Sequence, residues 1–210
     1  MTLKFIIDKK YDLTMVSSGP IFKQAEIEVE YKKLNKYLKY SCNEYQKSWD
    51  EIDSKFSKYV ENVTGYKWYY KKYECAISPV HQGISNWGNG GKIVRWWKEN
   101  AFTQRRITAH ELILSHYFEI YLHNYSESNL NENQVWALAE IAAFAITSTP
   151  GAQVFWPWDK RGYYTNHNYP QLVDLQVKLK NKFLKRKNFD EYIKTGIKLV
   201  KNLDISPNSK

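Results

Sequence analysis

The stretch ITAHELILSHYFEIYL, from Ile107 to Leu122, decides how this chain is expected to fold. Its apolar residues recur at helical spacing and predict a helix over roughly 103–124. A second apolar stretch, VWALAEIAAFAI (135–146), predicts another helix over roughly 132–147. The connection between them, HNYSESNLNEN, is short, so the two helices are expected to lie side by side and antiparallel.

The segments before this pair predict strands, and the whole pattern therefore predicts an α+β fold. LKFII (3–7), KWYYKKYECAISP (67–79) and KIVRWW (92–97) have the aromatic and β-branched content of strands. We expect them to form a small N-terminal sheet, mixed or antiparallel, accompanied by helices. The C-terminal half is expected to be rich in helix.

Further helices are expected on both sides of the central pair. Residues 21–40 look helical, although AEIEVEY within them alternates and could also form a strand. Residues 44–65 have apolar residues at helical spacing, and Gly65 is a typical stop signal. The chain closes with two more helical segments, 170–184 and 189–202.

Length and composition bound the class of protein. A chain of 210 residues fits one domain, expected over 1–205, with 206–210 as a frayed tail. The two cysteines make neither a disulfide framework nor a zinc ribbon, and the N-terminus does not resemble a signal peptide. A cytoplasmic setting is therefore expected. The longest apolar stretch is too short to cross a bilayer and contains Glu140, so no membrane is expected as a partner.

The net charge of +9 comes mostly from lysines spread along the chain. A basic surface attracts phosphate, which keeps nucleic acid as an alternative partner. Recognition of bases and of bidentate phosphate favours arginine over lysine, and no nucleic-acid-reading motif is present. The charge alone therefore does not make nucleic-acid binding the leading function.

His110 and Glu111 begin a pattern that catalytic zinc sites place on a helix. In that pattern a second histidine follows four residues after the first, so that both imidazoles leave one helix face. Here Leu114 occupies that position, and the next histidine is His116. In a regular helix His110 and His116 lie about 120° apart and nearly two turns apart, too far to converge on one ion. His110 is the candidate first metal ligand, Glu111 the candidate general base, and His116 a second ligand only if the helix is irregular.

Two other arrangements of ligands are possible. His116, Glu119 and His123 share one helical face and form an alternative metal site, or else a polar stripe in which Glu119 pairs with a histidine. Glu140 lies inside the apolar second helix, where a carboxylate is costly unless it is paired or bound to metal. It is therefore either a third ligand presented to His110 or the partner of a basic residue.

An aromatic loop, expected over 148–170, follows the second helix. In an enzyme its residues Tyr163, Tyr164 or His167 would contact the substrate or polarise a carbonyl in the transition state. Such a loop can equally pack over the core, because buried Trp and Tyr fix long loops in place. His81 could approach the site from the strands, although a single loop histidine is usually solvated.

These stretches together resemble a group of small bacterial zincin-like metallopeptidases. The resemblance is carried by the His-Glu-Leu helix that continues into Tyr117 and Phe118, and by the following Trp-x-x-x-Glu helix. It implies a zincin-like fold, zinc as cofactor, His110 and Glu140 as zinc ligands and Glu111 as general base. The chain departs from the family at the second histidine.

Three functions remain open from the sequence. The first is a zinc-dependent peptidase in which Glu111 takes a proton from metal-bound water that attacks a peptide carbonyl. The second is an inactive zincin-like descendant that binds a peptide or protein partner. The third is a basic nucleic-acid-associated protein.

Overall fold

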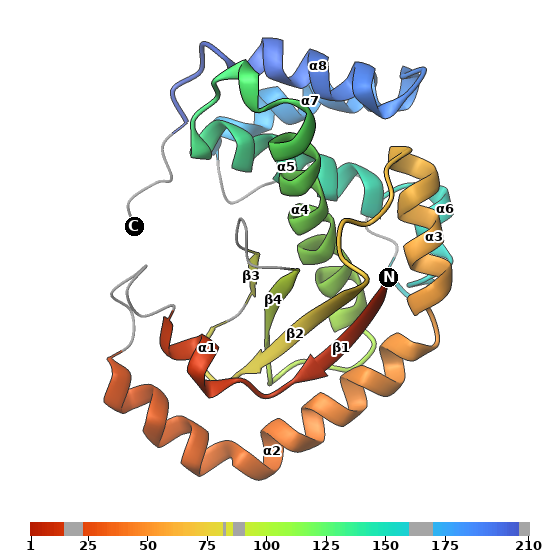
Figure 1. Ribbon diagram of the computed structural model, residues 1–210. Coiled ribbons are helices and arrows are strands. Elements are labelled where there is room, and N and C mark those ends of the chain that lie inside the picture. The colour runs from red at the N-terminus through yellow and green to blue at the C-terminus, as the bar shows by residue number, and fades with distance from the viewer. Residues whose placement is uncertain (15–22, 82, 86–90, 160–169, 206–210) are drawn as a thin grey trace.

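The computed structural model describes the chain except residues 15–22, 82, 86–90, 160–169 and 206–210 (Figure 1). Of residues 83–85, 170 and 171 only the backbone is described. The expected frayed tail at 206–210 therefore lies outside the described residues.

A four-stranded sheet occupies the N-terminal half of the chain. Its strands are β1 (Thr2–Ile6), β2 (Lys72–Ser78), β3 (Gly83–Ser85) and β4 (Lys92–Trp96), in the order β1-β2-β4-β3. β1, β2 and β4 are parallel, and the short edge strand β3 is antiparallel to β4. The α+β class and the mixed sheet are confirmed, whereas an antiparallel sheet is wrong. Parallel strands need a long crossover, and the helices between β1 and β2 supply one.

Within the described residues, three helices join β1 to β2: α1 (Lys9–Thr14), α2 (Gln24–Asp50) and α3 (Asp53–Thr64). The alternative that AEIEVEY forms a strand is wrong, since these residues lie in α2, which runs along the lower side of the sheet in Figure 1. The single helix expected over 44–65 is broken at Glu51 and Ile52, where the sequence has neither Gly nor Pro. Buried Ile52 begins α3 in a new direction, and Gly65 ends it in the left-handed conformation, with φ of 75°.

The two central helices have the expected bounds. α4 spans Gln104–Asn124 and α5 spans Glu132–Thr147, with a 3₁₀ turn, Ser126–Ser128, between them. They pack against each other, and α4 also contacts β3 and β4. Asn131 caps α5 by accepting a hydrogen bond from the Gln134 amide.

The second half of the chain is helical, as expected. After α5 come α6 (Pro150–Gln153), α7 (Pro170–Lys185) and α8 (Phe189–Val200). Pro150 begins α6, with Thr149 as its N-cap. Asp190 at the start of α8 accepts hydrogen bonds from Tyr66, at 2.5 Å, and from Tyr125, which ties the C-terminal helices to the rest of the molecule.

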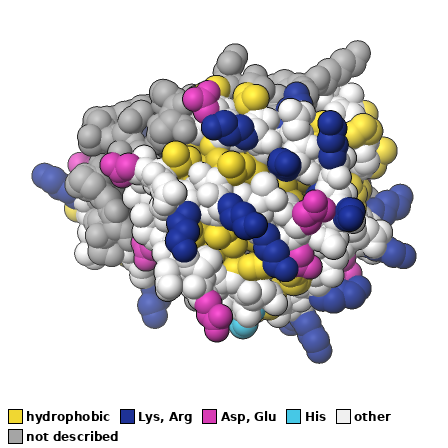
Figure 2. Space-filling view, turned by 90° about the horizontal axis from the view of Figure 1, so that it is seen from above, with side chains coloured by type: hydrophobic (Ala, Val, Ile, Leu, Met, Phe, Trp, Pro, Cys, Tyr) yellow, Lys and Arg dark blue, Asp and Glu magenta, His cyan; other side chains and the backbone are white. Residues whose placement is uncertain are grey.

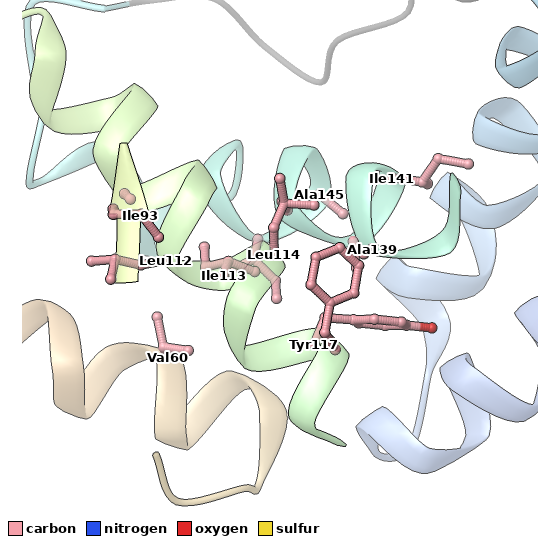
Figure 3. Packing of buried hydrophobic residues seen from close by; sticks show 14 of the residues in the cluster. Val60, Ile93, Leu112, Ile113, Leu114, Tyr117, Ala139, Ile141 and Ala145 are labelled. Carbon is pink, nitrogen blue, oxygen red and sulfur yellow. The ribbon is translucent and has the colours of Figure 1, made fainter. Parts of the chain in front are cut away.

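The core surrounds α4, which is buried on most sides. Figure 3 shows Leu112 of α4 between Ile93 of β4 and Val60 of α3, with Leu114 and Tyr117 on the side of α4 that faces α5. A helix that is apolar on most sides belongs in the centre of a domain. Most polar side chains on α4 are therefore drawn into the interior, although His123 near its end is exposed, and this positions the candidate site. Among the helices of the described residues, none is long and apolar enough to cross a membrane.

Candidate functional site between α4 and α5

His110 and Glu140 meet across the two central helices. Nε2 of His110 lies 3.0 Å from Oε2 of Glu140, and 13% of each side chain is exposed. The His110 ring also packs against Phe144 of α5, with 4.6 Å between ring centroids. Nδ1 of His110 is buried and has no hydrogen-bond partner among the described residues. The antiparallel helix pair thus brings together two residues that are 30 positions apart in the chain.

The Glu140 carboxylate favours the protonated form of His110. Burial alone lowers the pKa of His110, but the charge and hydrogen bond of Glu140, helped by the charge of Glu111, raise it above the ordinary 6.5. The Arg95 guanidinium acts in the opposite direction and only partly offsets this.

Glu111 and Arg95 complete a polar cluster inside the core. Glu111 follows His110 on α4 and is 8% exposed. Arg95 lies on β4, is 3% exposed, and donates to both carboxylate oxygens of Glu99 at 2.5 and 2.6 Å. The helix begins at Gln104, so Glu111 lies in its third turn.

His116 does not join this cluster. Its ring packs against Trp68, at 4.5 Å between centroids, on a different side of α4 from Glu140. It is 1% exposed, and neither ring nitrogen has a hydrogen-bond partner among the described residues. Burial lowers the pKa of His116 to about 3, and the Glu61 charge only partly offsets this effect. α4 runs unbroken through residues 112–115, so the irregularity that a metal role for His116 requires is not observed.

On the alternative metal face, Glu119 and His123 make ordinary polar contacts, whereas His116 does not take part in them. Glu119 accepts a hydrogen bond from the Tyr70 hydroxyl at 2.8 Å and lies 3.5 Å from Nε2 of His123. The His123 ring stacks on Tyr69, with 4.7 Å between centroids. Glu119 pairs with a histidine, as the alternative interpretation expected, although it is buried rather than half-exposed.

The described residues do not fit a catalytic zinc ion. Such a site needs three protein ligands and an open position. His110 and Glu140 could supply two ligands, but Leu114, at the position of the missing histidine, is 4% exposed and packs in the core. Within the described residues no group of three or more His, Cys, Asp or Glu side chains could hold a metal ion.

Of the remaining candidate residues, the structure describes only His81. Tyr163, Tyr164 and His167 lie outside the described residues. His81 is not simply solvated: its Nδ1 lies 2.9 Å from Oδ1 of Asp12, which is fully buried and accepts a hydrogen bond from Tyr31 at 2.6 Å.

Sequence reasoning missed two polar groups that the fold buries. Arg95 was hidden in the strand pattern of KIVRWW, and Asp12 lies in a short helix among charged neighbours. A basic residue inside an apolar strand was the one available signal for Arg95, because a buried cation needs a carboxylate partner. Nothing in the sequence marked Asp12.

No protein-family model, no curated protein and no solved structure matches this chain. The resemblance to zincin-like metallopeptidases therefore stays an expectation from the motif residues.

Proposed function

We propose that this protein is a zincin-like binding protein that works without a metal and contacts an extended peptide segment of a protein partner. The zincin-like part is supported by the order of strands, α4 and α5, and by the approach of Glu140 to His110. It is one of the functions that the sequence leaves open, and it accounts for Leu114 at the position of the second histidine.

The hydrogen bond between His110 and Glu140 carries the proposal. The two side chains that the family resemblance assigns to zinc satisfy each other at 3.0 Å. Leu114 lies in the core and His116 packs against Trp68, and among the described residues no group of three ligands forms around the pair. A hydrogen-bonded ion pair is one way in which a buried carboxylate is stabilised without a metal.

The strand and helix next to the His110–Glu140 pair are of the kind that binds an extended peptide. β3 is the edge strand of the sheet and contacts α4, the helix that carries His110. An edge strand offers backbone groups to which a peptide can add as a further strand, and neighbouring side chains then select its sequence. The His110–Glu140 pair, whose side chains are both partly exposed, would provide a polar contact of this kind.

Metal content tests the absence of zinc. Wild-type protein and His110→Ala are each incubated with zinc, freed of unbound metal, and analysed for zinc per chain. We expect no stoichiometric zinc in either protein. About one zinc per chain in the wild type, lost in His110→Ala, would instead support a metal site completed by other residues and would make peptidase assays the next step.

Binding is tested separately with an unbiased peptide display library. Peptides enriched on the wild type should bind His110→Ala about tenfold or more weakly, because the mutation removes the polar contact. His123→Ala is the matched control, since the His123 side chain is 60% exposed and distant along α4. Failure to enrich any peptide, or equal losses in both variants, would contradict the binding role.

A further inference from the structure

The outward face of α7 exposes aliphatic side chains that the core does not need. Leu172, Leu175, Leu179 and Phe183 already anchor the helix through its buried stripe. Val177 and Leu184 lie on the other side, 49% and 65% exposed. They are seven residues apart, so they lie on one face of the helix, two turns from each other. Core packing therefore does not account for them.

Lysines border these two side chains. Lys178, Lys182 and Lys185 are exposed on the same helix, and Lys180 is half-exposed. Residues 170–205 contain nine Lys and Arg and four Asp and Glu, so this helical pair carries more than half of the net charge of +9. Figure 2, which views the molecule from the side of α7 and α8, shows lysine and arginine side chains interspersed with apolar ones. The basic character of the chain is thus concentrated here.

We propose that the outward face of α7 docks on an anionic lipid bilayer surface. Anionic headgroups need only positive charge nearby, which lysines provide without the bidentate geometry that favours arginine. Val177 and Leu184 project outward, which suits partial burial between headgroups. The acyl boundary of a bilayer takes up aliphatic side chains directly, whereas single-stranded nucleic acid favours aromatic rings and the duplex surface presents phosphates.

Docking through α7 is independent of the proposed peptide site, because α7 does not carry the His110–Glu140 pair. It also revises one expectation from the sequence. The expectation of no membrane partner rested on the missing spanning segment, and a helix that lies on a surface needs none.

Co-sedimentation of the full chain with vesicles tests the docking. We expect binding to vesicles of phosphatidylcholine with phosphatidylserine, and little binding to phosphatidylcholine alone, at physiological ionic strength. The triple variant Lys178→Glu, Lys182→Glu, Lys185→Glu should reduce partitioning about tenfold or more. Leu184→Ser should reduce it about fivefold without any change of charge. Thermal melting checks that each variant is folded.

The matched control is Lys32→Glu, Lys36→Glu, Lys39→Glu on α2. These lysines are also exposed, and the control has the same net charge as the α7 variant. It should change partitioning less than about twofold. Equal losses in both triple variants would overturn the proposal, as would equal binding to both kinds of vesicle. Binding to duplex DNA that competes with vesicles and is unaffected by Leu184→Ser would assign this face to nucleic acid instead.

Discussion

At the scale of single residues, two histidines on one helix have opposite properties. His110 faces a carboxylate, which raises its pKa, whereas His116 is enclosed by Trp68 and its pKa falls to about 3. Their separation of six residues along the chain places the two rings on different sides of α4. The two histidines thus differ because each side of α4 packs against a different segment of the chain. The sequence around the histidines does not indicate which segment that is.

The depressed pKa of His116 predicts a loss of stability in acid. The unfolded chain binds a proton as the pH falls below about 6.5, while folded His116 stays neutral down to about pH 3. The contribution of neutral His116 to the free energy of unfolding is therefore fully present above pH 6.5. It declines as the pH falls toward 3. Between pH 7 and pH 5, wild type should lose about 2 kcal/mol more of its unfolding free energy than His116→Leu. Urea denaturation at the two pH values measures this difference.

His123→Leu is the control for that measurement. It makes the same substitution on the same helix, but at a side chain that is 60% exposed. If wild type and His116→Leu lose equal stability between the two pH values, the buried, neutral state of His116 is wrong.

At the scale of elements, the turn before β4 depends on a glycine that the sequence did not distinguish from its neighbours. Gly91 has φ of 80°, and its carbonyl accepts a hydrogen bond from the Glu74 amide at 3.2 Å. A Cβ atom placed on Gly91 would lie 2.7 Å from Cδ1 of Tyr73, a fully buried ring. Gly65, at the end of α3, has a similar φ of 75° but open space around it.

The two glycines form a matched pair for mutation. Gly65→Ala should cost about 1 kcal/mol, because a side chain is unfavourable in the left-handed conformation. Gly91→Ala should cost at least about 1 kcal/mol more, because the methyl group also displaces a packed ring. Chemical denaturation of both variants gives the comparison, and equal costs would show that the Tyr73 ring moves aside freely.

At the scale of the whole molecule, the sequence predicted the elements better than their arrangement. The bounds of α4 and α5 followed from apolar periodicity, and their antiparallel packing followed from the short connection. The parallel direction of β1, β2 and β4 did not follow, because strand direction depends on crossovers rather than on local composition. The break at Glu51 and Ile52 has no local signal either.

The candidate site was also predictable only in part. Glu140 stood out because a carboxylate inside an apolar helix needs a partner, and His110 of the neighbouring helix is that partner. Arg95 and the Asp12–His81 contact depend on how distant segments pack, so they became visible only in the structure.

The measurement that tests the central claim most directly is an NMR titration of the His110 ring in wild type and Glu140→Gln, with and without added zinc. If the two side chains form a hydrogen-bonded pair in place of a metal site, the pKa of His110 lies above 6.5 in wild type. It then falls in Glu140→Gln, where burial is no longer offset by a carboxylate charge, and zinc changes neither titration. A His110 signal that stops titrating when zinc is added, or a pKa that Glu140→Gln leaves unchanged, would contradict the account.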